Sequence, residues 1–193
     1  LERADGATWW EWKDGSRPFH WRWPEEYIET VRDGLPVYFV RKPPKYTKAQ
    51  QDIKEKEIKA LVLSKLKKVR DRRYIAPGHV VGLICFFEVA KGDCDIRMVY
   101  NGSESGLNDC MWVPRFMLPT IQTHLRAVGP NTYMSDVDLG EFFLNFMLHP
   151  TIRPHTGVDF TKYFPNESGT AVWEAWQRAA MGLRSSPYQA VQA

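Results

Sequence analysis

An acid and an aromatic residue five positions apart are the first candidates for chemistry in this chain. The stretch 135–148 is predicted to end an apolar strand at Asp138, and it places Phe143 within the apolar run that follows. A carboxylate at the end of a strand is well placed to bind a hard divalent cation such as Mg²⁺. The same pattern also fits an acid that caps a helix N-terminus, so residues elsewhere must decide between the two.

Two cations lie upstream, beside a predicted hairpin turn. Lys91 precedes the turn, Arg97 follows it, and Leu107-Asn108 come after a loop. A Lys point charge and an Arg fork are together suited to binding a triphosphate. Cations near a turn are otherwise ordinary solvated surface charges, so the pair alone leaves both interpretations open.

A glycine turn lies downstream, where residues 181–188 read Met-Gly-Leu-Arg-Ser-Ser-Pro-Tyr. Gly182 permits another backbone to approach closely. Ser186 and Pro187 are typical of the first turn of a helix. Taken alone, the string indicates only a turn before a helix.

In this order the three blocks resemble the fingers and palm of reverse transcriptases. The first catalytic motif of that family has an Asp followed five residues later by Tyr or Phe, which Asp138 and Phe143 match. Residues 181–188 resemble the second palm motif, and Lys91, Arg97 and Leu107-Asn108 resemble the fingers hairpin. Two extra residues separate Arg97 from Leu107-Asn108 compared with many relatives. The resemblance covers residues 45–192.

The resemblance implies a site for two Mg²⁺ ions, an incoming deoxynucleoside triphosphate and an RNA or DNA template-primer. The expected metal ligands are the Asp138 carboxylate and the Leu139 backbone carbonyl. Phe143 would stack under the sugar and exclude a 2'-hydroxyl. The full expected nucleotide set is Lys91, Arg97, Gly140, Glu141, Phe143, Met181 and Gly182. The expected template-primer set is Arg184, Ser186 and Pro187. Asp136 is interpreted as a surface residue or an indirect support of the metal ligand.

One part of the family pattern is missing. Reverse transcriptases carry an aromatic-x-Asp-Asp motif after the second palm helix, and this sequence contains no Asp-Asp dipeptide. One carboxylate cannot hold two metal ions in working geometry. We therefore expect a fragment that lacks the later palm and the thumb and is inactive by itself.

Two hypotheses follow from these observations. The chain is either a piece of a retrotransposon or retrovirus-like RNA-directed DNA polymerase, or a non-catalytic nucleic-acid-binding or protein-interaction module derived from such an element. An aromatic-x-Asp-Asp motif in the reading frame after residue 193 would favour the first, and an immediate natural stop would favour the second.

Charge is concentrated in one segment of the chain. The net charge is only +3, but residues 41–73 hold 13 basic and 4 acidic side chains. Such clustering favours phosphate binding. The same segment predicts a helix with a capping box at Thr47 to Gln50 and one apolar stripe, formed by Ile58, Leu61, Val62, Leu66 and Val69. Its charged face is predicted to be free to meet a template-primer.

Cysteine and tryptophan usage add two further expectations. The three cysteines are widely spaced and lack a zinc-ligand pattern, which indicates reduced thiols in an intracellular protein that has no signal peptide and no membrane span. Five of the eight tryptophans lie within residues 9–23. They are interpreted as a satellite core or docking surface, with stacking on single-stranded bases as the alternative.

The expected fold is α/β (α+β): a reverse-transcriptase-like fingers and incomplete palm, with a small antiparallel sheet backed by helices. The expected parts are a tryptophan-rich arm (1–44), a basic helix and fingers hairpin (45–115) and a partial palm (116–193). A connecting helix is predicted between Pro119 and Gly129-Pro130. The resemblance implies two or three strands of fingers and palm within residues 151–178, including one at residues 172–177, although propensity alone also allows a helix at residues 171–180.

Overall fold

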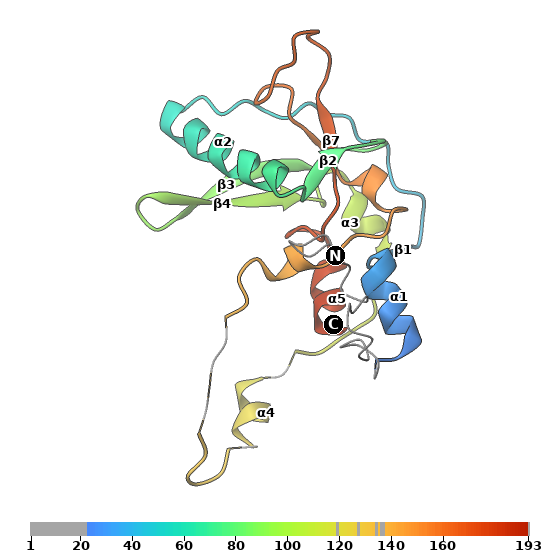
Figure 1. The fold of residues 1–193 in the computed structure, drawn as a ribbon, viewed down its shortest axis with the longest axis vertical. Coiled ribbons are helices and arrows are strands. Elements are labelled where there is room, and N and C mark those ends of the chain that lie inside the picture. The colour runs from blue at the N-terminus through green and yellow to red at the C-terminus, as the bar shows by residue number, and fades with distance from the viewer. Residues whose placement is uncertain (1–22, 119, 127, 134, 136–137, 193) are drawn as a thin grey trace, which may run out of the picture.

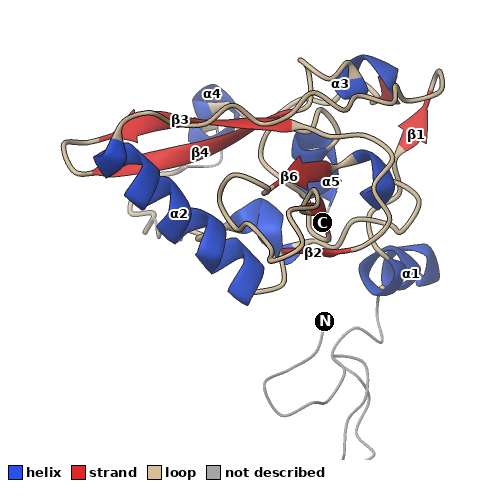
Figure 2. Ribbon diagram, turned by 90° about the horizontal axis from the view of Figure 1, so that it is seen from above, coloured by secondary structure: helices blue, strands red, loops and turns tan. Residues whose placement is uncertain are grey.

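The computed structural model describes residues 23–118, 120–126, 128–133, 135 and 138–192. In these residues the chain is a mixed α/β protein with small antiparallel sheets and five α-helices (Figures 1 and 2). This confirms the expected α/β class with small antiparallel sheets.

The basic helix forms, but it begins later than predicted. α2 spans Lys56–Asp71, and its N-cap, Glu55, makes no side-chain capping hydrogen bond. The predicted capping box at Thr47 to Gln50 is therefore wrong, because these residues lie in extended chain and the Gln50 side chain bonds to Phe86 instead. The predicted apolar stripe is confirmed: Val62 and Leu66 are fully buried, and its other members pack against the core.

The predicted hairpin forms in the structure. β3 (Cys85–Lys91) pairs with β4 (Asp95–Asn101) in an antiparallel register that runs from Cys85 opposite Asn101 to Lys91 opposite Asp95. Gly92 supplies a positive φ of 66° in the turn. α2 packs on β4, and both views place this helix alongside the hairpin.

A second sheet forms the centre of the molecule. Its strand order is β2 (Ile75–Pro77), β7 (Trp173–Trp176) and β6 (Gly157–Asp159), and all pairs are antiparallel. The strand predicted at residues 172–177 is therefore confirmed, as is the expectation of two strands within residues 151–178. The segment forms a strand, although propensity also allows a helix, because β7 pairs with β2 on one side and with β6 on the other and buries Trp176 at 1% exposure.

A two-stranded pairing connects the N-terminal part of the described chain to the rest. α1 (Glu25–Asp33) ends at Gly34, and β1 (Tyr38–Phe39) pairs antiparallel with β5 (Met111–Trp112). Gly34 has φ 103°, and a Cβ there would lie 2.7 Å from the Leu148 backbone. Of the tryptophan cluster only Trp23 lies within the described residues, where it packs edge to face on Tyr27.

Short helical turns complete the chain. α3 (Leu107–Cys110) follows the hairpin, η1 (Phe142–Asn145) and η2 (Arg153–His155) are 3₁₀ turns, and α5 (Ser186–Gln192) ends the described part. The helix predicted to start at Ser186-Pro187 is thus confirmed. The buried core includes residues of α2, the β3–β4 hairpin, the central sheet and α3, and η1 packs against it.

The predicted connecting helix is shorter than expected. α4 spans only Ile121–Leu125 and starts at a capping box between Thr120 and Thr123. None of its residues is buried, and Ile121 and Leu125 are exposed. A helix whose apolar face has no partner gains little from packing and stays short. In Figure 1 this segment projects away from the β3–β4 hairpin and from the central sheet.

The apolar strand predicted to end at Asp138 is not seen in the described residues. Ser135 and Asp138 lie in irregular chain, while Met134, Asp136 and Val137 lie outside the described residues, so nothing is assigned to Asp136. A strand needs a neighbour to satisfy its backbone groups. No sheet pairing reaches described residues 120–140.

Candidate functional site

The segment around Asp138, which was compared with the first palm motif, is exposed at its acidic end. Asp138, Leu139 and Gly140 are all exposed, and Leu139 is 59% accessible. No group of three His, Cys, Asp or Glu side chains able to hold a metal ion occurs among the described residues. The described residues therefore do not by themselves supply the cluster of ligands that a pair of Mg²⁺ ions requires.

Glu141 connects this segment to the basic helix. Its carboxylate accepts hydrogen bonds from Lys68, Arg72 and the Tyr74 hydroxyl. The bond from Lys68, with the nearby Arg72 charge, holds the pKa of Glu141 below its ordinary value. Glu141 also adopts a left-handed backbone with φ 55°, just before η1. Glu141 belongs to the expected nucleotide set, and in the structure its side chain is engaged by these three partners.

Phe143 lies against the core of the protein. It is half-buried in η1, with Phe142 5.9 Å away between ring centroids. η1 contacts α5, the helix that begins at Ser186. The elements that carry the first and second palm-like motifs are therefore neighbours.

The glycine turn of residues 181–188 packs against the hairpin. Gly182 has φ 110°, and a Cβ there would lie 1.8 Å from the Tyr100 carbonyl oxygen, so only glycine fits. The Asn108 side chain donates from Nδ2 to the Gly182 carbonyl at 2.9 Å and accepts from the Arg184 amide at 2.9 Å. The Asn108 side chain thus hydrogen-bonds to both sides of the turn.

The other predicted residues of this block divide by exposure. Ser186 is buried, and its hydroxyl donates to the Ala180 carbonyl at 3.0 Å. Met181, Arg184 and Pro187 are exposed. Of the predicted template-primer set, Arg184 and Pro187 are therefore available at the surface, while Ser186 is buried and bonds to the segment before α5.

The two predicted phosphate-binding cations lie on the outer face of the hairpin. Val89 is opposite Arg97, and Lys91 is opposite Asp95. Because residues two apart on a strand share a face, Lys91 and Arg97 lie on the face opposite buried Ile96. Both side chains are exposed. No hydrogen bond or ion pair connects either one to Asp138 in the described part of the chain.

Much of the charged face of α2 is engaged within the protein, which corrects the expectation that this face is free. Its ion pairs are Lys59 with Asp52, Lys65 with Asp95, Lys68 and Arg72 with Glu141, and Arg70 with Glu174. Charge clustering in the sequence does not reveal this, because three of the acids, Asp95, Glu141 and Glu174, come from distant segments. Within the described residues Lys56, Lys67 and Arg73 make no ion pair. Lys67 and Arg73 border a hollow of about 680 Å³.

The Arg70 pair is the most enclosed of these contacts. Glu174 on β7 has a side chain only 4% exposed, and it accepts from Arg70 Nε at 3.0 Å and from Nη2 at 2.6 Å. The guanidinium also lies 4.3 Å from the Phe164 ring centroid. This arrangement fixes α2 on the central sheet and leaves Arg70 unsuited to binding phosphate.

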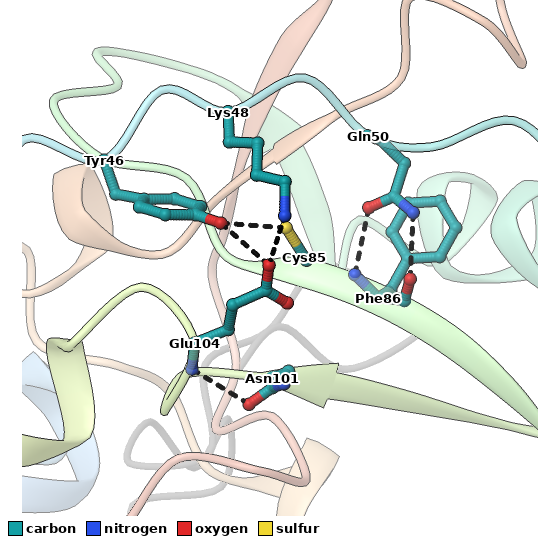
Figure 3. A network of polar contacts seen from close by, with 7 residues as sticks. All are labelled: Tyr46, Lys48, Gln50, Cys85, Phe86, Asn101 and Glu104. Atoms are coloured by element: carbon teal, nitrogen blue, oxygen red, sulfur yellow. Dashed lines mark hydrogen bonds and ion pairs between the residues drawn. The ribbon is translucent and has the colours of Figure 1, made fainter.

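A polar network before α2 is structural rather than catalytic (Figure 3). Glu104 Oε1 accepts from the Tyr46 hydroxyl at 3.0 Å and from Lys48 Nζ at 2.7 Å, with the Cys85 thiol beside the phenol. Burial raises the pKa of the Cys85 thiol. Since the thiolate is the nucleophilic form, Cys85 is a poor nucleophile.

Two polar residues important for these arrangements were not singled out as site residues from the sequence. Asn108 was visible only as the second residue of the Leu-Asn pair. Gln50 had no signal beyond its predicted capping position. Side-chain amides are hard to recognise in a sequence because they act through backbone groups that are distant along the chain, 74 residues away for Asn108 and Gly182.

Comparison of the chain with models of known protein families gives no match, and comparison with curated proteins gives none either. Among the described residues, no helix is both long and apolar enough to cross a bilayer.

Proposed function

We propose that this chain is the fingers and part of the palm of an RNA-directed DNA polymerase. The single observation that carries the proposal is the pair of hydrogen bonds between Asn108 and the turn from Gly182 to Arg184. Asn108 belongs to the block that resembles the fingers, and the turn belongs to the block that resembles the second palm motif. A shared nucleotide site needs these blocks to be neighbours.

Further support comes from the surroundings of the two blocks. η1, which carries Phe143, contacts α5, and the hairpin presents Lys91 and Arg97 on one exposed face. In the proposed function these two cations hold the triphosphate of the incoming deoxynucleotide. Phe143 packs under its sugar, and Arg184 and Pro187 contact the template.

The unpaired cations at the end of α2 are proposed to bind the template-primer backbone. Lys67 and Arg73 are exposed, border the 680 Å³ hollow and make no ion pair within the described residues. Because each phosphate contact releases counterions, their contribution should depend on salt. The paired cations Lys59, Lys65 and Arg70 should contribute less.

The first test measures template-primer binding by fluorescence anisotropy at two salt concentrations. The double variant Lys67→Glu, Arg73→Glu should bind an RNA–DNA template-primer at least about tenfold more weakly, with a salt slope shallower by about one per removed cation. Lys162→Glu, an exposed charge reversal elsewhere, is the control. Equal losses of affinity in the double variant and in Lys162→Glu would show that binding follows the overall charge, and would contradict the proposed interface.

The second test measures nucleotide binding by photo-cross-linking of an azido-dATP with template-primer and magnesium present. Lys91→Glu and Arg97→Glu should lower cross-linking about tenfold while template-primer affinity stays near wild type. Phe143→Val should weaken the preference for dATP over ATP as competitor, whereas the neighbouring Phe142→Val should not. Unchanged cross-linking in both cation variants would remove the nucleotide site from the hairpin.

A second candidate function is a non-catalytic nucleic-acid-binding or protein-interaction module. It is favoured by the observation that the described residues hold no cluster of three metal-binding side chains. Such a module would retain template-primer affinity but show no cross-linking that depends on Lys91 and Arg97. The two tests above therefore separate the two candidates.

A further inference from the structure

Three hydrogen-bond donors surround the Glu141 carboxylate at the C-terminal end of α2. Lys68 donates to one carboxylate oxygen, and Arg72 and the Tyr74 hydroxyl donate to the other. Lys68 and Arg72 are four residues apart, so they extend from one face of the helix. Cationic and hydroxyl donors that converge on two oxygens are the groups with which proteins bind a carboxylate or a phosphate. The site is therefore built for an oxyanion, and the chain supplies one of its own.

A third cation lies beside this group and has no acidic partner. The Gln177 amide donates to the Tyr74 carbonyl, and the next residue, Arg178, lies near Tyr74. Arg178 is half-buried, and its Nη1 donates to the Asn145 carbonyl at 3.4 Å. It makes no ion pair within the described residues. Because charges withdrawn from water are usually paired, Arg178 adds positive charge that the described chain leaves unbalanced.

The charge of this group is better matched by a phosphate monoester than by a carboxylate. Lys68, Arg72 and Arg178 carry three positive charges, whereas Glu141 carries one negative charge. A phosphate monoester has a charge of about −1.5 to −2 at pH 7 and three strong acceptor oxygens. It can therefore balance more of the positive charge and accept from more of the donors than Glu141 does.

Glu141 is held in a way that allows it to leave. Its backbone has a positive φ of 55°, which is unfavourable for a residue with a side chain. Its side chain is 36% exposed, and those of Lys68 and Arg72 are each 48% exposed, so solutes reach the donors. The neighbouring residues 138–140 are exposed, and no described strand pairs with them. Release of the Glu141 carboxylate therefore uncovers no buried side chain of this segment.

We propose that Lys68, Arg72 and Tyr74, with Arg178 beside them, bind a phosphate monoester group. In the free chain the Glu141 carboxylate occupies this site, and the phosphate displaces it. The phosphate can come from a small phosphorylated compound or from the phosphorylated end of a nucleic-acid strand. The site is distinct from the proposed template-primer and nucleotide contacts and does not rest on the proposed polymerase function.

The test uses isothermal titration of the whole chain with inorganic phosphate at pH 7. Glu141→Gln should bind phosphate about tenfold more tightly than wild type, because a neutral amide competes less for the donors. A purely structural role of Glu141 predicts no gain. Glu167→Gln removes the same charge at an exposed loop position outside this group, and its affinity should equal that of wild type.

The donors are tested by the double variant Lys68→Gln, Arg72→Gln. It should bind phosphate at least about tenfold more weakly, and adding Glu141→Gln to it should no longer raise the affinity. Lys59→Gln, Lys65→Gln is the matched control, because it also removes two ion-paired cations of α2.

The matched control should retain wild-type affinity. Should the Lys68 and Arg72 double variant fail to fold, Tyr74→Phe replaces it. Tyr74→Phe loses only the hydroxyl and should weaken binding about threefold.

Three results would overturn the proposal. They are a Glu141→Gln variant that binds phosphate no more tightly than wild type, an equal gain in Glu167→Gln, and unchanged affinity after loss of the donors. None of these variants alters Lys67, Arg73, Lys91 or Arg97, so failure here is separate from failure of the template-primer and cross-linking tests.

A short single-stranded oligothymidylate, with and without a 5'-phosphate, distinguishes the two sources of the phosphate. Tighter binding of the phosphorylated strand than of both inorganic phosphate and the unphosphorylated strand assigns the site to a strand end. Equal binding of the phosphorylated strand and inorganic phosphate assigns it to a small phosphorylated compound. Equally tight binding of the two strands would show that the strand backbone binds instead, and would overturn the choice of a monoester.

Discussion

At the scale of single residues, Gly182 shows how one position can determine whether two parts of the chain meet. Its φ of 110° and the close Tyr100 carbonyl exclude any side chain. Asn108 then bonds to both sides of the same turn. The contact between the hairpin and the turn therefore depends on the absence of a side chain at Gly182 as much as on the hydrogen bonds of Asn108.

Replacing Gly182 with Ala should destabilise the protein by at least about 3 kcal/mol, because both the backbone conformation and the Tyr100 contact become unfavourable. Urea unfolding followed by circular dichroism measures the change. Gly140→Ala is the matched control, since no atom lies within 4 Å of the Cβ position there. That variant should stay within about 0.5 kcal/mol of wild type. Similar losses in both proteins would contradict the account of Gly182.

Glu141 makes a pH-dependent prediction at the same scale. Its folded pKa is lowered from the ordinary 4.5, chiefly by Lys68. The ionised carboxylate therefore contributes stability that is present above pH 4.5 and is lost as pH falls through the lower folded value. Since the side chain is 36% exposed, the contribution should be less than about 1 kcal/mol.

Urea unfolding of Glu141→Gln from pH 7 to pH 3 tests this contribution. The variant should be less stable than wild type at pH 7, and the difference should shrink once the pH falls below 4.5. Glu167→Gln, at an exposed loop position, serves as the control and should show no such trend. A difference that stays constant with pH would show that the ion pairs with Lys68 and Arg72 contribute nothing.

At the scale of elements, the side chain of Gln50 acts as a partner for the edge of β3 (Figure 3). Gln50 Oε1 accepts from the Phe86 amide at 3.0 Å, and Nε2 donates to the Phe86 carbonyl at 2.9 Å. The Gln50 amide also donates to Asp159 Oδ2 at 3.1 Å. The extended segment before α2 is thereby fixed between the hairpin and β6, although it forms no strand.

Gln50→Ala should remove the two side-chain hydrogen bonds and leave the Phe86 backbone groups buried without partners. We expect a loss of about 2 kcal/mol and faster amide hydrogen exchange at Phe86, measured by NMR. Gln51→Ala, at the exposed neighbouring position, should change neither quantity. Unaltered exchange at Phe86 in Gln50→Ala would mean that another group protects this edge.

At the scale of the whole molecule, burial ranks the three cysteines clearly. Cys94 is exposed in the hairpin turn, Cys85 is half-buried with a raised pKa, and Cys110 is buried with its thiol near the Gly106 carbonyl. The sequence analysis predicted unpaired thiols, and all three are free in the structure.

Titration of the native chain with a disulfide reagent should modify one thiol quickly, because Cys94 is exposed, whereas Cys110 is buried and Cys85 is half-buried with a raised pKa. All three thiols should react once the chain is unfolded in urea. Cys94→Ser should abolish the fast phase while leaving the fold intact. Two or more fast thiols in the native wild-type chain would contradict the packing around Cys85 and Cys110.

The sequence by itself determined the elements whose apolar pattern is strong. The stripe of α2 and the start of α5 at Ser186 follow from local periodicity and turn chemistry. The hairpin and the strand at residues 172–177 were expected from the family resemblance, because propensity alone also allows a helix at residues 171–180. The predicted capping box was wrong because Gln50 has a better partner in Phe86. The strand ending at Asp138 was not seen in the described residues. α4 is short because its apolar side chains Ile121 and Leu125 are exposed and gain little from packing.

Only the tertiary structure decided which charges and polar groups are available. Asp52, just before α2, and three acids distant along the chain pair with most cations of α2. Asn108 bonds to Gly182, 74 residues away, and Ser185 and Gln189 line a cavity whose walls come from five elements. Local patterns carry no information about such contacts, because ion pairing and burial depend on which distant segments meet.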